Sequence, residues 1–270
     1  MTIESVALWL GLLGYVAAGV CAVVALILER DGARLVGPAL ALGLALHTLS
    51  LAARWARLGH GPFVSMFEIL SSNVWSLTLA FALAWWRIRA IRPVAAFVMP
   101  VIFLMMGWLL VSSPVDGHFP PTYRTLWLYV HIGFGRVFLG AVLVSVGLSA
   151  AILARASGVG RRRLAGLPAD ERLDDLSFRF MGIGLVFESL MLVSGAIWAQ
   201  DAWGRYWSWD PLETWALLTW LALAFALHVR VAVRVPPPVG AMLVIGVFAV
   251  AFLTFFGVPF VSTSPHKGAV

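Results

Sequence analysis

Charged residues are scarce in this sequence of 270 residues. Asp, Glu, Lys and Arg make up only 12% of the chain, about half the share found in soluble domains, whereas 61% of the residues are hydrophobic. A water-soluble domain of this size could not bury so much apolar surface. The composition therefore predicts an integral membrane protein.

Cysteine and several catalytic motifs are also missing. Cys21 is the only cysteine, which excludes a disulfide, a CxxC redox pair and a cysteine-ligated metal site within one chain. The sequence has no Walker-type phosphate-binding loop, so this polypeptide alone cannot drive transport with ATP. No Ser/His/Asp or paired-carboxylate arrangement supports a hydrolase.

The apolar residues are gathered in eight long runs, each long enough to cross a bilayer as a helix. The runs lack the alternating period of barrel strands, so an all-α polytopic membrane protein is favoured over an outer-membrane barrel. We expect a single transmembrane helical domain over residues 1–270, with helices at about 5–28, 36–56, 64–86, 94–113, 125–154, 177–200, 212–233 and 239–261.

The distribution of arginine predicts how the chain is oriented. Loops on the cytoplasmic side of a membrane protein carry an excess of Lys and Arg. Alternate loops hold twelve arginines, whereas the opposite loops and the C-terminal tail hold only Arg54, Arg57, Arg124, Arg205 and Lys267. The arginine-poor side is therefore expected to be the outer face of a bacterial cytoplasmic (inner) membrane, and both termini are expected to lie there.

Tryptophan is concentrated in the outer loop between the sixth and seventh predicted helices. Six tryptophans fall within the 23 residues from Trp198 to Trp220, and the centre of this segment reads WGRYWSWDPLETW from Trp203 to Trp215. An aromatic interface belt explains a lone Trp at a helix end. It does not explain Asp210, Pro211 and Glu213 between the rings, although these residues also suit a helix N-terminus. An aromatic shelf with few charges would bind a large, flat, apolar ring system by stacking.

The segment WGRYWSWDPLETW resembles the WWD signature of the haem-handling membrane proteins of cytochrome c biogenesis. Its WxWDPxETW form is similar to the CcsA (ResC) family of system II. The resemblance implies a protein that binds haem b, moves or presents it at the outer face and, with a ResB/CcsB-type membrane partner, supports its attachment to the CxxCH motif of apocytochrome c. It also implies a subunit of a cytochrome c haem lyase (holocytochrome c synthase) complex. The alternatives are a haem-binding or haem-exporting protein of the HemX/YpjD or CcmC type without ligation activity.

The same resemblance suggests the residues that hold the haem. In the family, two outer histidines flank the WWD loop and ligate the iron, and His131 and His266 match them. His228 matches a membrane-embedded histidine thought to hold haem in transit, and His47 is a candidate for its partner ligand. The residues expected to contact the ring lie in the Trp-rich segment: Trp203, Trp207, Trp209, Asp210 and Trp215.

Several charged residues complete the predicted set. Arg136 and Glu188 are expected to lie at depths in the membrane that differ by only about 2–3 Å. Because an unpaired charge in the membrane interior is unfavourable, we expect them to form an ion pair. The arginines near the outer face are expected to suit haem propionates: Arg54, Arg57, Arg124 and Arg205.

Overall fold

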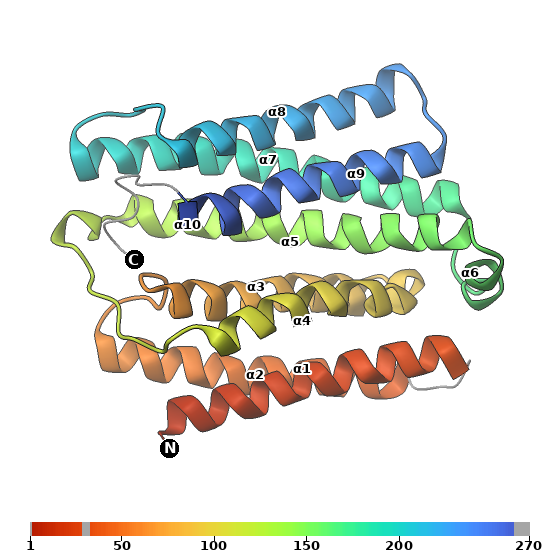
Figure 1. The fold of residues 1–270 in the computed structure, drawn as a ribbon, viewed down its shortest axis with the longest axis horizontal. Helices are drawn as coiled ribbons and strands as arrows, with labels where there is room; N and C mark the ends of the chain where they lie inside the picture. The colour runs from red at the N-terminus through yellow and green to blue at the C-terminus, as the bar shows by residue number, and fades with distance from the viewer. Residues whose placement is uncertain (1, 29–32, 262–270) are drawn as a thin grey trace. The chain divides into compact units, whose positions relative to one another are not determined.

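The computed structural model describes residues 2–28 and 33–261, and within these ranges the chain forms helices and no strands. Eight of the helical segments are long and apolar enough to cross a membrane. The predicted all-α polytopic fold is confirmed, with the Trp-rich loop between the sixth and seventh of these spans. The backbone is divided into two compact units (Figure 1). The assignment of the whole chain to one transmembrane domain stays a prediction.

Unit 1 comprises residues 1–118 and 153–169. Its long helices are α1 (Ile3–Leu28), α2 (Ala33–Leu58), α3 (Met66–Arg87) and α4 (Ala95–Val111), with the 3₁₀ turn η1 (Arg89–Val94) before α4 and the short helix α6 (Gly158–Arg163) at the end of the unit. Each long helix packs against the next, and α4 returns to α1, so the four helices form a closed bundle.

Small residues allow α1 and α2 to approach closely. A Cβ added at Gly14 would lie 2.8 Å from the Cα of Gly43, which leaves no room for any other side chain. Such contacts replace the hydrophobic driving force that is missing between helices in lipid.

Unit 2 comprises residues 119–152 and 170–270. It contains the turn η2 (Pro121–Tyr123), most of α5 (Leu126–Arg155), α7 (Asp170–Trp203), α8 (Pro211–Ala232) and α9 (Pro237–Phe252). The last helix continues through a π-helical turn, η3 (Leu253–Gly257), into α10 (Val258–Val261). All the described residues that we expect to ligate the iron or to contact the haem ring, except His47, belong to this unit.

The observed helix ends differ most from the predicted ones at α7. It begins at Asp170 rather than near residue 177, because the stretch that precedes its apolar run is also helical. The first turn contains Asp170 and Glu171, whose negative charges are favourable at the positive end of the helix dipole.

Candidate functional site

The Trp-rich loop is held by a capping box at the start of α8. The Asp210 carboxylate accepts a hydrogen bond from the Glu213 amide at 2.9 Å, and the Glu213 carboxylate accepts from the amides of Asp210 and Ser208, at 3.3 and 2.7 Å. Pro211 takes the first helical position, where the missing amide hydrogen is no loss. The polar residues within the motif therefore fix the loop backbone against the helix.

Trp209 adopts a backbone conformation that is rare for a bulky residue. Its φ angle is +59°, in the left-handed region, which costs a side chain with a Cβ roughly 1–3 kcal/mol. The side chain is 69% exposed, and its ring meets that of Trp207 edge-on, with centroids 5.7 Å apart. Strain that holds an aromatic ring in the open is typical of a binding site.

His131 lies near the start of α5 and is fixed by α7. Its Nδ1 donates a hydrogen bond to the Met191 carbonyl oxygen at 2.9 Å. The ring packs on Gly195, where an added Cβ would lie 2.7 Å from Nδ1. Because the carbonyl can only accept, the neutral imidazole carries its proton on Nδ1 and its lone pair on Nε2. This is the tautomer that a metal-binding histidine commonly adopts.

An aromatic cluster connects His131 to the Trp-rich loop. The His131 ring stacks on Trp198 at 5.9 Å, with 22° between the planes. Trp198 in turn meets Trp203 at 4.9 Å and Tyr123 at 5.1 Å, both edge-on. Burial raises the pKa of the Tyr123 hydroxyl, which therefore stays uncharged at physiological pH. The cluster is an apolar platform beside the imidazole.

The backbone carbonyl of Trp215 is held by two buried threonines. Its carbonyl oxygen accepts from Thr219 Oγ1 at 2.9 Å and from Thr254 Oγ1 at 3.2 Å, and the two hydroxyls are 2.7 Å apart. Thr254 belongs to the π-helical turn η3. Such turns recur at functional sites, and this one brings a hydroxyl from the last span to the WWD segment.

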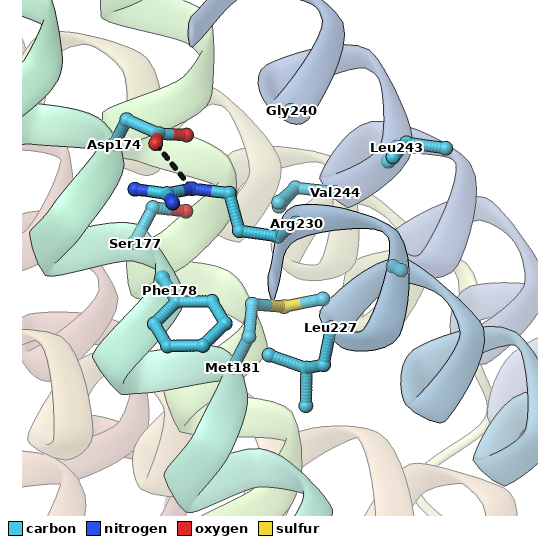
Figure 2. Close-up of a pocket in the computed structure, with 10 residues that line it drawn as sticks. Asp174, Ser177, Phe178, Met181, Leu227, Arg230, Gly240, Leu243 and Val244 are labelled. Atoms are coloured by element: carbon cyan, nitrogen blue, oxygen red, sulfur yellow. Dashed lines mark hydrogen bonds and ion pairs between the residues drawn. The ribbon is translucent and has the colours of Figure 1, made fainter. Parts of the chain in front are cut away.

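His228 lies on the exposed face of α8. Arg230, two residues further along α8, lines a small pocket between α7, α8 and α9 (Figure 2). Its Nε donates a hydrogen bond to the Asp174 carboxylate at 2.6 Å. The Arg230 guanidinium also lies over the Phe178 ring, 5.4 Å from its centroid. His228 does not line that pocket, and because its side chain is exposed it faces the outside of unit 2.

His47 has a different environment, in unit 1. It is fully buried between α1 and α3, with Nδ1 3.3 Å from the Tyr15 hydroxyl and Nε2 3.0 Å from the Ser71 hydroxyl. Both ring nitrogens thus have protein partners. His266, the predicted second outer ligand, lies outside the residues that the structure describes.

Two of the arginines expected to bind haem propionates, Arg54 and Arg57, already donate hydrogen bonds to carboxylates of this chain. Arg54 is 3% exposed and donates to Glu68 at 3.0 Å and to Glu4 at 2.7 Å. Arg57 donates to Glu4 and to Asp116, at 3.1 and 2.7 Å. These contacts tie the start of α1 and the loop after α4 to α2 and α3, which is a structural role. Arg124 and Arg205 are exposed.

The predicted ion pair between Arg136 and Glu188 is wrong. Glu188 is fully buried, and neither of its carboxylate oxygens has a hydrogen-bond partner within residues 2–28 and 33–261. The depth estimate ignored the direction of the side chains around the helix. Gly135 and His131 lie on the face of α5 that meets Met191 of α7, and Arg136 is turned from Gly135 by about 100°.

Four residues of this site were not among the predicted haem contacts: Trp198, Tyr123, Met191 and Gly195. Trp198 could have been included, because it belongs to the same crowd of tryptophans. Met191 contributes its backbone and Gly195 its lack of a side chain, so residue type gave no signal for either.

Comparisons with known proteins show the family to which the chain is similar. The family model for "Cytochrome C assembly protein" matches residues 33–266. The "Cytochrome c biogenesis protein CcsA" of Prochlorococcus marinus (strain MIT 9301) is 30% identical over 249 residues, covering 82% of this chain and 80% of the relative. The protein of the same name from Chlamydomonas reinhardtii is 29% identical, over 82% of this chain and 65% of its own length.

A solved structure shares the fold. The "Cytochrome c Heme Lyase CcmF" superposes with a TM-score of 0.74 at 19% identity, and the match covers all of this chain and 49% of that one. The eight-span helical fold and the family model together define a multi-pass membrane protein of the cytochrome c assembly type. The chain belongs to the CcsA family of cytochrome c biogenesis proteins, as the WWD resemblance predicted.

Proposed function

We propose that this protein binds haem b, presents it at the outer membrane face and, with a ResB-type partner, supports its covalent attachment to the CxxCH motif of apocytochrome c. The observation that carries the proposal is the setting of His131. A carbonyl holds its Nδ1, Trp198 stacks on its ring, and the cluster continues into the WWD segment through Trp203. An imidazole whose Nδ1 is held by a carbonyl has the tautomer in which Nε2 would ligate the iron of a haem.

The proposal gives the Trp-rich residues two kinds of role. Trp203, Trp207, Trp209 and Trp215 supply aromatic faces and edges for a flat porphyrin. Asp210 acts through the capping box, by holding the loop that carries the rings. His266 is the proposed second axial ligand because of its position in the family pattern.

His228 is the proposed site of haem on its way to the outer face. Its face of α8 also carries Leu221 and Phe225, which are 49% and 61% exposed. An exposed imidazole among apolar side chains suits a ring that approaches from lipid or from a partner subunit. We therefore assign the second ligand at this position to the ResB-type partner. We give His47 a packing role, because its ring nitrogens are already engaged.

The orientation in this proposal follows the arginine distribution. The start of α8 and the end of α7, which border the Trp-rich loop, belong to the arginine-poor side of the spans. That side is the outer one under the positive-inside rule.

The attachment step needs no nucleophile from this chain. Each CxxCH thiol adds across a haem vinyl group: sulfur bonds to one vinyl carbon, a proton goes to the other, and the carbon–carbon double bond becomes single. The histidine of CxxCH then replaces one axial ligand. The protein holds the porphyrin so that the vinyl groups and thiols meet, which is catalysis by positioning.

The visible spectrum of the purified, detergent-solubilised protein tests the proposal. We expect a six-coordinate b-type haem in the wild type and its loss or alteration in both His131→Ala and His266→Ala. His118→Ala, an exposed loop histidine, is the matched control and should retain the spectrum. A wild type that remains colourless after haem is added in the presence of the partner would refute the proposal.

Product formation separates attachment from haem binding alone. Co-expression with a ResB-type protein and an apocytochrome c should yield covalent cytochrome c, detected by haem staining after denaturing electrophoresis. Haem binding without product would favour the HemX/YpjD or CcmC type of function instead.

A further inference from the structure

Unit 1 contains a cavity that the haem proposal does not use. It has a volume of about 220 Å³, enough for roughly seven water molecules. It lies at the arginine-rich end of the helices, between the ends of α1 and α3 and the segment that includes α6. The residues that define its character are Leu26, Val36, Trp85, Arg92, Arg163 and Leu167.

The cavity combines two cations with apolar walls. Arg92 and Arg163 line it, and no carboxylate is among its described lining residues. The Arg92 guanidinium lies 4.7 Å from the centroid of the Trp85 ring. Its Nε is buried and has no hydrogen-bond partner within residues 2–28 and 33–261. A buried guanidinium nitrogen without an acceptor is costly, so the geometry points to an acceptor that enters from outside.

Hydrogen bonds within the chain fix the wall of the cavity beside Arg163. Arg155 donates to the carbonyl oxygens of Leu164, Leu167 and Pro168, at 2.8, 2.7 and 2.6 Å. On the other side, the Trp85 indole donates to the Arg92 carbonyl at 3.1 Å, which fixes η1 to α3. These bonds occupy Arg155 and the loop carbonyls, and leave the guanidinium groups of Arg92 and Arg163 to serve a ligand.

We propose that this cavity binds the head group of an anionic phospholipid, with the phosphate between Arg92 and Arg163 and the upper acyl chain against Leu26 and Val36. Both the charge and the apolar wall are needed to explain the site: a free anion would not use the wall, and a neutral lipid would not use the arginines. Basic pockets at the cytoplasmic ends of membrane helices are a known setting for such head groups. The proposal is independent of haem binding, because its residues all belong to unit 1.

Native mass spectrometry of the full-length protein, released from nanodiscs, tests this site. The discs contain equal parts of phosphatidylglycerol and phosphatidylcholine, and the measurement is the number of each lipid retained. We expect the wild type to retain phosphatidylglycerol, and the double variant Arg92→Gln/Arg163→Gln to lower its apparent affinity about thirtyfold. The matched control is Arg87→Gln/Arg161→Gln, which removes the same charge from exposed arginines outside the cavity lining and should change retention less than about twofold.

A second variant tests the apolar wall without changing charge. Ala25→Phe places a ring in the cavity and should displace phosphatidylglycerol while both arginines remain. Thermal unfolding of each variant in detergent identifies any that fail to fold.

Four outcomes would overturn the proposal. They are equal loss of lipid in the two double variants, equal retention of the two lipids by the wild type, displacement by inorganic phosphate alone, and loss of the haem spectrum instead of lipid in Arg92→Gln/Arg163→Gln. The third would assign the site to a free anion, and the last to haem propionates.

Discussion

Two histidines in membrane-spanning helices, His47 and His131, illustrate how one residue type serves different purposes. His47 bonds to two hydroxyl groups, each able to donate or accept, so either tautomer is satisfied. His131 bonds through Nδ1 to a carbonyl, which can only accept, so its tautomer is fixed. The nature of the hydrogen-bond partner, more than the depth in the membrane, therefore distinguishes the two histidines: it fixes the tautomer of His131 and leaves both tautomers open to His47.

The contrast extends to the surroundings of each histidine. In unit 1, the buried Arg54 and Glu68 are engaged with one another and with their neighbours. In unit 2, His131 adjoins a platform of aromatic rings formed by Trp198, Trp203 and Tyr123. We therefore expect substitutions in the first network to change stability, and those around His131 to change haem binding.

Arg54→Ala should have the largest effect on stability. It leaves the fully buried Glu68 without its cation, a loss worth about 3–5 kcal/mol for buried pairs. We expect a much lower unfolding temperature in detergent, measured by intrinsic fluorescence. The amount of haem bound per folded molecule should stay at the wild-type level. A selective loss of haem in this variant would contradict the distinction between a stabilising network in unit 1 and a haem site around His131.

A pair of glycine substitutions sharpens the comparison between His47 and His131. A Cβ at Gly195 would lie 2.7 Å from His131 Nδ1, and one at Gly11 would lie 3.0 Å from the His47 amide nitrogen. Overpacking should destabilise each variant by about 1–3 kcal/mol. Only Gly195→Ala should shift the haem absorption bands, because it displaces the His131 ring. A spectral change in Gly11→Ala as well would show that His47 is linked to the haem.

Ser71→Ala should have a smaller effect. It removes the hydroxyl at His47 Nε2 while Tyr15 still contacts Nδ1, so about 1 kcal/mol of stability is expected to be lost. The check is the unfolding temperature beside that of Ser76→Ala, which removes a hydroxyl that donates to the Asn73 carbonyl of the same helix. An unaltered visible spectrum is expected in both.

The smallest expected effect is on the pH dependence of stability. Hydrogen bonds from Arg57 hold the pKa of Asp116 below its ordinary value of 3.8. The contribution of Asp116 to stability is therefore complete above about pH 4 and is lost as the pH falls through the lowered pKa. Its side chain is 51% exposed, so the contribution should stay below about 1 kcal/mol. Asp116→Asn should flatten this part of the stability profile, and a steeper acid transition in the variant would contradict the assignment.

The helices and the family could be predicted from the sequence, because apolar runs and the WxWDPxETW string are local features. The arrangement around His131 could not, since it depends on a carbonyl of Met191 and on the absence of a side chain at Gly195. The error over Arg136 and Glu188 has the same origin. Rise per residue gives depth along a helix, whereas pairing also requires the two side chains to face one another, and that depends on how α5 packs on α7.

The left-handed backbone of Trp209 separates selection for function from selection for stability. Glycine and asparagine adopt this conformation at lower cost than tryptophan. A library of variants at position 209 that is screened only for heat resistance should therefore enrich those two residues. A library screened for cytochrome c maturation should keep tryptophan. Divergence of the two screens at this position would identify Trp209 as a residue retained in spite of its effect on folding.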